Sequence, residues 1–139
     1  MLNKVLELIV IASLLAMSTN AASSSAYKCH IKNLKHLNDS GELVDFWDDE
    51  TFKVMKKELV VDRDTGRMSG ATSNHGPYGQ PRVIDKGNDE QAYKALTIVE
   101  PFTTVDFLYV QEFAKGAEKP FFFITGERYY SGLCRNYMG

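Results

Sequence analysis

The C-terminal end of the chain constrains the fold most strongly. Residues 121–124 are Phe-Phe-Phe-Ile, and after the short segment 125–127 a second strand-like run ends at Cys134. Side chains alternate between the two faces of a strand, so a strand over 121–124 is apolar on both faces. We therefore expect a hairpin with its turn at 125–127, whose first strand lies deep in the fold with a covering element on each side.

The first residues predict export. A short basic start, residues 1–4, precedes an apolar run over 5–17 that only Glu7 and Ser13 interrupt, and a small polar segment follows. This order is typical of a secretory signal peptide. A membrane anchor is the alternative, but the apolar run is shorter than the roughly 20 residues that cross a bilayer. We therefore expect no membrane span once the signal has been removed.

The expected domain organisation follows from the cleavage site. Residues 1–21 form the predicted signal peptide, with cleavage after Ala21 or as late as Ala26, and residues 22–26 form a short linker. Residues 27–139 then form a single β-rich domain in the periplasm or outside the cell, because a chain of this length supports one core. The formal net charge of −2 gives no electrostatic reason to expect nucleic-acid binding.

The two cysteines lie near the two ends of the mature chain. In an oxidising compartment, Cys29 and Cys134 are expected to form one structural disulfide that ties the first strand to the last. The alternative is a pair of redox-active thiols, but such pairs are normally close in sequence, as in Cys-x-x-Cys. We therefore predict the structural disulfide.

Alternating polarity predicts that most of the chain forms short strands. The expected strands before the final hairpin cover residues 27–31, 58–62, 67–70, 82–85, 92–99 and 104–113. Residues 48–57 combine apolar positions at helical spacing with an acidic start and a basic end, which favours a short helix over a strand at 52–55.

These elements predict a mainly β fold. We expect an antiparallel meander that forms a small barrel or sandwich with one short covering helix, and an α+β arrangement is the alternative. The helix over 48–57 is expected to cover one face of the strand over 121–124, since that strand has no polar side.

Motifs for catalysis and metal binding are weak. Residues 64–66 read Asp-Thr-Gly, as in aspartic proteases, but no second such motif supplies the partner carboxylate. A hairpin turn is the better interpretation. His30, His36 and His75 lack a spacing that would bring them together on a metal ion. We expect no catalytic residues, no metal and no cofactor.

The long loop at 71–81 is the best candidate for an exposed functional segment, because loops of this length on small domains are commonly functional. Amphipathic rings near it could line a pocket, whereas the competing interpretation is that they fill the core. The candidates for contact with a ligand or partner are Trp47, His75, Tyr78, Tyr93 and Tyr109.

Residues 60–70, 118–124 and 130–134 resemble segments of small exported bacterial proteins of uncharacterised function. The resemblance covers about a third of the chain and rests on hairpin and core patterns. It implies a periplasmic setting and supplies no catalytic residues.

Three functional hypotheses follow. The first is an exported binding module without catalysis, which takes a small apolar ligand or a protein partner through the loop at 71–81. The second is a small hydrolase that uses clustered carboxylates such as Asp62, Asp64 or Asp85. The third is a structural protein associated with the cell envelope.

Overall fold

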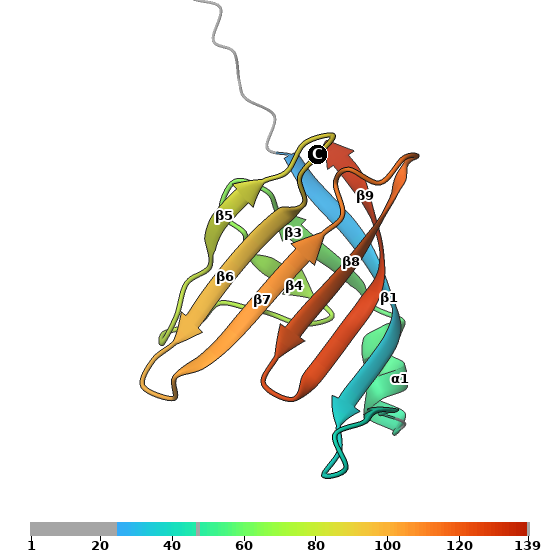
Figure 1. Ribbon diagram of the computed structural model, residues 1–139, viewed down its shortest axis with the longest axis vertical. Coiled ribbons are helices and arrows are strands. Elements are labelled where there is room, and N and C mark those ends of the chain that lie inside the picture. Colours follow the sequence, from blue (N-terminus) through green and yellow to red (C-terminus); the bar gives the residue numbers. More distant parts are fainter. Residues whose placement is uncertain (1–24, 47, 139) are drawn as a thin grey trace, which may run out of the picture.

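In a computed structural model of the chain, the structure describes residues 25–46 and 48–138. Within these ranges, nine strands and one helix follow one another (Figure 1). They are β1 (Ser25–Leu37), β2 (Leu43–Asp45), α1 (Asp49–Met55), β3 (Glu58–Asp62), β4 (Met68–Gly70), β5 (Arg82–Lys86), β6 (Tyr93–Val99), β7 (Thr104–Val110), β8 (Glu118–Thr125) and β9 (Arg128–Met138).

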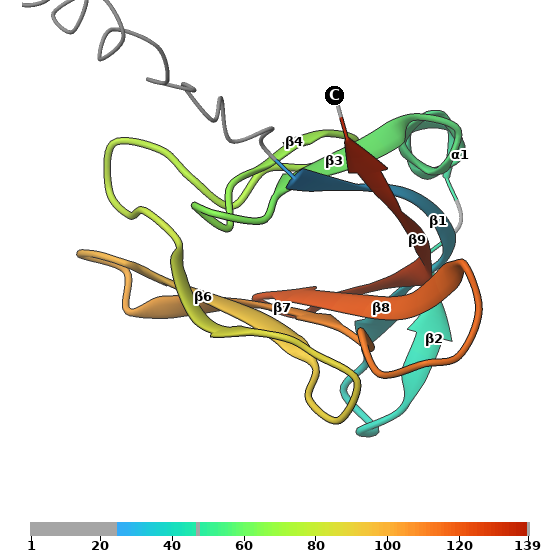
Figure 2. The ribbon, with the colours of Figure 1, turned by 90° about the horizontal axis from the view of Figure 1, so that it is seen from above.

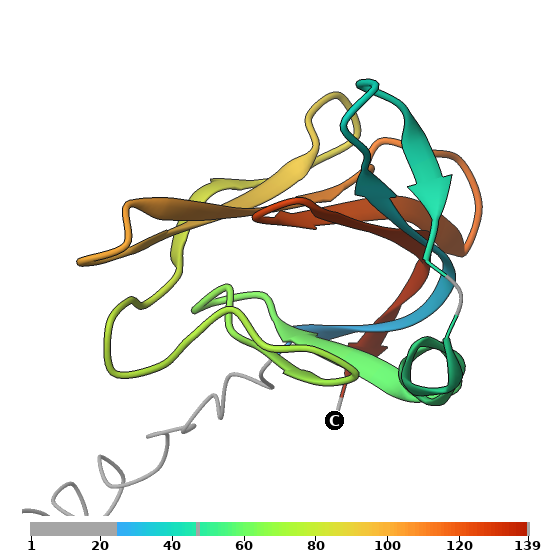
Figure 3. The same ribbon diagram turned by 90° about the horizontal axis from the view of Figure 1, so that it is seen from below.

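The described strands form one antiparallel sheet in the order β4-β3-β1-β9-β8-β7-β6-β5, and β2 pairs with the far end of β1. The sheet is strongly curled, so its two halves face each other as a half-barrel (Figures 2 and 3). Its end strands, β4 and β5, do not pair with each other in the described part of the chain. The prediction of a mainly β fold with one short helix is confirmed, and the sheet is an open form of the expected barrel.

The middle of the sheet is the long pair β1 and β9. Tyr27, Cys29 and Ile31 are buried on the inner face, and after a bulge between Ile31 and Asn33 the next buried residue is Leu34. A bulge adds one unpaired residue and increases the local twist and bend of the strand. It therefore keeps the apolar side chains inside although their spacing changes from two residues to three.

The core fills the concave side of the half-barrel. Its largest fully buried side chains include Tyr27, Tyr93, Phe123, Leu59 and Met68, which come from both halves of the curled sheet. The predicted disulfide is confirmed, because Cys29 and Cys134 are bonded across β1 and β9 and are both buried.

The helix forms where it was predicted but does not cover the strand that it was expected to cover. Asp48 caps it by accepting hydrogen bonds from the backbone N–H of Thr51 at 2.6 Å and from the Thr51 hydroxyl at 2.7 Å. The helix packs against β1 (Figure 1), so the expectation that it covers β8 is wrong. The outer face of β8 is instead partly covered by a neighbouring ring, since Phe122 stacks on Tyr109 of β7 at 4.8 Å.

Candidate functional site

The segment between β4 and β5 spans the open side of the half-barrel (Figures 2 and 3). Asn74 holds it there, because its side chain accepts a hydrogen bond from Met68 N–H at 2.8 Å and donates one to the Gly66 carbonyl at 2.8 Å. Its own carbonyl accepts from the Thr97 hydroxyl of β6 at 2.9 Å. The buried Asn74 therefore connects the β3–β4 hairpin to the opposite half of the sheet.

Two of the predicted contact residues come together in this segment. His75 and Tyr78 line a small cavity of about 140 Å³, together with Asp106 of β7. The Ser73 hydroxyl lies 3.3 Å from His75 Nδ1, but it also lies 3.3 Å from the carbonyl and 3.4 Å from the N–H of the same residue. These contacts describe a tight turn stabilised by a serine hydroxyl.

Two further predicted contact residues, Tyr93 and Tyr109, lie elsewhere. Tyr93 is fully buried in the core, and its hydroxyl donates to the Arg63 carbonyl at 3.1 Å. Tyr109 lies on the outer face of the sheet, stacked on Phe122. Trp47 lies outside the described residues. The structure therefore does not gather the four described candidates into one pocket.

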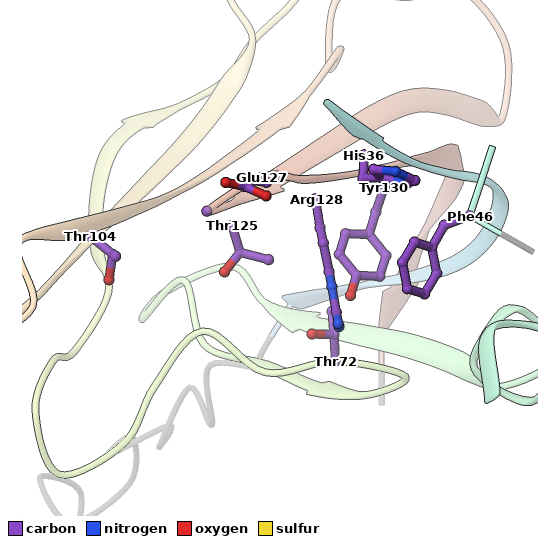
Figure 4. Close-up of a pocket in the computed structure, with 9 residues that line it drawn as sticks. His36, Phe46, Thr72, Thr104, Thr125, Glu127, Arg128 and Tyr130 are labelled. Atoms are coloured by element: carbon purple, nitrogen blue, oxygen red, sulfur yellow. The ribbon is translucent and has the colours of Figure 1, made fainter. Parts of the chain in front are cut away.

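A larger cavity of about 590 Å³ opens at the end of the half-barrel where β8 turns into β9. We call it the mouth cavity. Its lining comes from five separate parts of the chain and includes His36, Phe46, Thr72, Thr104, Arg128 and Tyr130. In Figure 4 the side chain of Arg128 extends towards Thr72, and the rings of Tyr130 and Phe46 are drawn to its right.

The mouth cavity combines rings, hydroxyls and one cation. The Arg128 guanidinium lies 5.3 Å from the centre of the Phe46 ring, and no carboxylate lies within ion-pair distance of it among the described residues. Its charge still acts on Asp48, whose pKa is lowered by hydrogen bonds from Thr51 and, to a smaller extent, by Arg128. His36 packs edge-on against Phe46 at 5.3 Å, and its buried Nδ1 atom has no hydrogen-bond partner in that part of the chain. Both polar groups therefore retain capacity to bind a further group.

A second polar cluster lies at the opposite end of the half-barrel. The Tyr27 hydroxyl donates to Glu112, and the Arg63 guanidinium lies 4.6 Å from the centre of the Tyr27 ring and 3.8 Å from Glu112. Burial and the hydrogen bond to Glu112 raise the pKa of Tyr27 well above its ordinary value. Burial also raises the pKa of Tyr93. These tyrosines stay neutral and hold the two halves of the sheet together.

Two of the three carboxylates of the hydrolase hypothesis, Asp62 and Asp85, have structural partners. Asp62 accepts hydrogen bonds from the N–H groups of Asp64 at 2.9 Å and Thr65 at 3.0 Å, which shapes the β3–β4 turn. Asp85 accepts from Gly87 N–H at 2.9 Å and lies 3.9 Å from the Lys94 ammonium. No group of three or more potential metal ligands converges among the described residues.

Comparison with known proteins found no match to a protein-family model, a curated protein or a solved structure. The described residues contain no helix that is long and apolar enough to cross a membrane. The features of the mouth cavity are therefore the basis for a functional proposal.

Proposed function

We propose that this protein is a small exported binding module that holds an amphipathic ligand in the mouth cavity. The ligand has an apolar, ring-sized body and an anionic group. The observation that carries the proposal is the lining of the mouth cavity, in which Phe46 and Tyr130 lie beside Arg128, a cation with no carboxylate within ion-pair distance among the described residues. A cavity of about 590 Å³ falls within the range of small-molecule sites.

The two kinds of lining group have separate roles. Phe46, with the small accessible part of the buried Tyr130, offers aromatic surface to the apolar body, and the guanidinium of Arg128 pairs with a carboxylate or phosphate. The buried Nδ1 of His36 gains a hydrogen-bond partner from the ligand, which removes the cost of leaving that atom unsatisfied. The hydroxyls of Thr72 and Thr125 supply further polar contacts at the opening.

Two features support the export part of the proposal. The apolar run over 5–17 after a basic start is typical of a secretory signal. The disulfide between Cys29 and Cys134 is typical of proteins from oxidising compartments. A module of this kind takes up its ligand in the periplasm or outside the cell.

A titration followed by ¹H–¹⁵N NMR tests the site with defined probes. We expect 2-naphthoate to shift the amide signals of Thr72, Thr125 and Arg128, because its ring and carboxylate match the rings and the cation. Naphthalene-2-methylamine has the same ring with a positive charge, so it should bind at least tenfold more weakly, which corresponds to about 1.4 kcal/mol.

Matched arginine variants complete the test. Arg128→Gln should remove the preference for naphthoate over the amine. Arg82→Gln changes another exposed arginine, on β5, and should leave the preference unchanged. Shifts confined to the outer rings of β7 and β8, or equal binding of both probes to the unmodified protein, would contradict the proposed site.

A further inference from the structure

The outer face of the sheet carries a second hollow, which is lined by cations. Its volume is about 490 Å³, and we call it the basic groove. Its charged and imidazole side chains are Lys28, His30, Lys56, Lys57, Glu58 and Arg135. It lies away from the mouth cavity and shares no lining residue with it.

Strand register fixes one wall of the basic groove. Lys28 of β1 lies directly opposite Arg135 of β9, and the next pair along the two strands is the disulfide between Cys29 and Cys134. The covalent bond therefore holds the two cations at neighbouring positions. Lys56 and Lys57, in the short segment between α1 and β3, supply further cations to the same groove.

The basic groove has an excess of positive charge. Lys28 lies 3.5 Å from Glu58, and Arg135 lies 2.8 Å from Glu118. In contrast, Lys56 and Lys57 have no ion-pair partner among the described residues. Four cations and one carboxylate give the lining a formal charge of +3, and since the whole chain carries −2, its other residues together carry −5.

We propose that the basic groove binds an acidic polysaccharide, whose sulfate or carboxylate groups pair with Lys56, Lys57 and their neighbours. Charge complementarity carries the proposal, because a positive hollow on a negative molecule attracts anions to one place and repels them elsewhere. Cations on β1 and β9 and in the segment after α1 suit a chain with several anionic groups better than a single small ion.

The shape of the groove favours a polysaccharide over other polyanions. A flat lipid surface meets cations that project from a protein, whereas these cations surround a hollow. Single-stranded nucleic acids are held largely by stacking of bases on open aromatic rings. Apart from the His30 imidazole, the one ring in the lining is Tyr137, and the Lys28 ammonium lies over it at 4.0 Å from its centre.

Calorimetric titration of the full protein, with its disulfide intact, tests the proposal. The probes are a heparin-derived hexasaccharide, which carries sulfates, and hexagalacturonate, which carries carboxylates, with neutral maltohexaose as control. We expect at least one acidic probe to bind, with an affinity that falls as salt rises, and no binding of the neutral one. Lys56→Gln/Lys57→Gln should weaken that binding by about tenfold.

The control variant makes the same change in net charge elsewhere. Lys86→Gln/Lys115→Gln alters two exposed lysines outside the groove and should leave affinity within about twofold. Lys56→Arg/Lys57→Arg keeps both charges and should retain binding. Binding of one acidic probe but not the other supports the proposal and identifies the anionic group.

Several outcomes would overturn the proposal. These are equal weakening in both double variants, equal binding of maltohexaose, or no binding of either acidic probe. Binding that is confined to oligothymidylate, to vesicles rich in phosphatidylglycerol or to a poly-glutamate peptide would overturn it as well, because each would identify a different class of partner. Loss of the naphthoate site has no bearing on this result, since the two hollows share no residue.

Discussion

Replacing Asn74 with alanine should destabilise the protein more than almost any other single change outside the apolar core. Asn74 is 4% exposed, and its side chain is the partner of one N–H group, at Met68, and one carbonyl, at Gly66. Both partner residues are buried. An alanine at this position therefore leaves a buried donor and a buried acceptor without their bonds.

The expected magnitude follows from these two groups. Each buried polar group left unsatisfied costs about 1–3 kcal/mol, so Asn74→Ala should lower the free energy of unfolding by about 4 kcal/mol. Small domains are stable by roughly 5–15 kcal/mol, so this loss is a large share of the total. Thr97→Val removes only the hydroxyl that donates to the Asn74 carbonyl and should cost about 1 kcal/mol.

Urea unfolding followed by circular dichroism, with the disulfide intact, measures the effect. With a denaturant slope of about 1–2 kcal/mol per molar, the midpoint of Asn74→Ala should fall by about 2–4 M. Ser73→Ala removes only the exposed hydroxyl of the neighbouring turn and should cost no more than about 1 kcal/mol. Because Asn74 and Thr97 hold the same segment, the double variant should lose less than the two single losses added together.

The reasoning would be refuted if Asn74→Ala were no less stable than Ser73→Ala. Such a result would mean that Met68 N–H and the Gly66 carbonyl find other partners when the amide is gone. Hydrogen exchange at the Met68 amide shows whether that N–H group depends on Asn74 or finds another partner. We expect the Met68 amide to exchange much faster in Asn74→Ala, whereas unchanged exchange would show that its bond to Asn74 is dispensable.

Three further predictions concern other parts of the fold. Cys29→Ala/Cys134→Ala should lower stability by up to about 4.7 kcal/mol in urea unfolding, since the bond closes a sequence separation of 105 residues, and equal stability of reduced and oxidised protein would contradict this. Tyr27 and Tyr93 have raised pKa values in the folded protein, so the folded state favours their neutral forms. The folded protein is therefore most stable below the ordinary tyrosine pKa of 10.0, and it loses stability as the pH rises above that value and the unfolded chain ionises. Between pH 9 and pH 11 each of the two tyrosines should lower the free energy of unfolding by about 1.4 kcal/mol. A variant with phenylalanine at both positions should lack this decline. Gly132→Ala should destabilise by about 1–3 kcal/mol in thermal unfolding, because its Cβ would lie 2.0 Å from the His30 carbonyl oxygen, and an unchanged midpoint would show that β1 can move aside.

Much of the fold could be predicted because alternation and turn residues are local signals. The hairpin at 58–70, the short helix and the final hairpin follow from such signals; the last was expected over 120–134 and extends over 118–138. The disulfide follows from the number and placement of the cysteines and is present as well. The covering of β8 could not be predicted in this way. Alternation shows that both faces of this strand are apolar, but Phe122 meets Tyr109 only because β7 pairs with β8 in one particular register.

The candidate site was harder to predict because its residues are far apart in the sequence. Aromatic character and loop length drew attention to His75 and Tyr78, which do lie together. The same criteria selected Tyr93, although burial makes it part of the core. Arg128 gave no signal of its own, since an arginine after a hairpin turn is ordinary until the curl of the sheet brings it beside Phe46.

The place of the disulfide in the β1–β9 ladder determines how the domain responds to mechanical load. Ser25 pairs with Met138, so a force that separates the two ends of the described chain peels β1 from β9 one residue pair at a time. Only the four pairs from Ser25 to Lys28 lie outside the disulfide, and peeling stops at Cys29 and Cys134. The disulfide bypasses the backbone between the two cysteines, which therefore bears no direct pull while that bond is intact. The mouth cavity lies wholly within this protected part, whereas Lys28, Arg135, Asn136 and Tyr137 of the basic groove lie outside it.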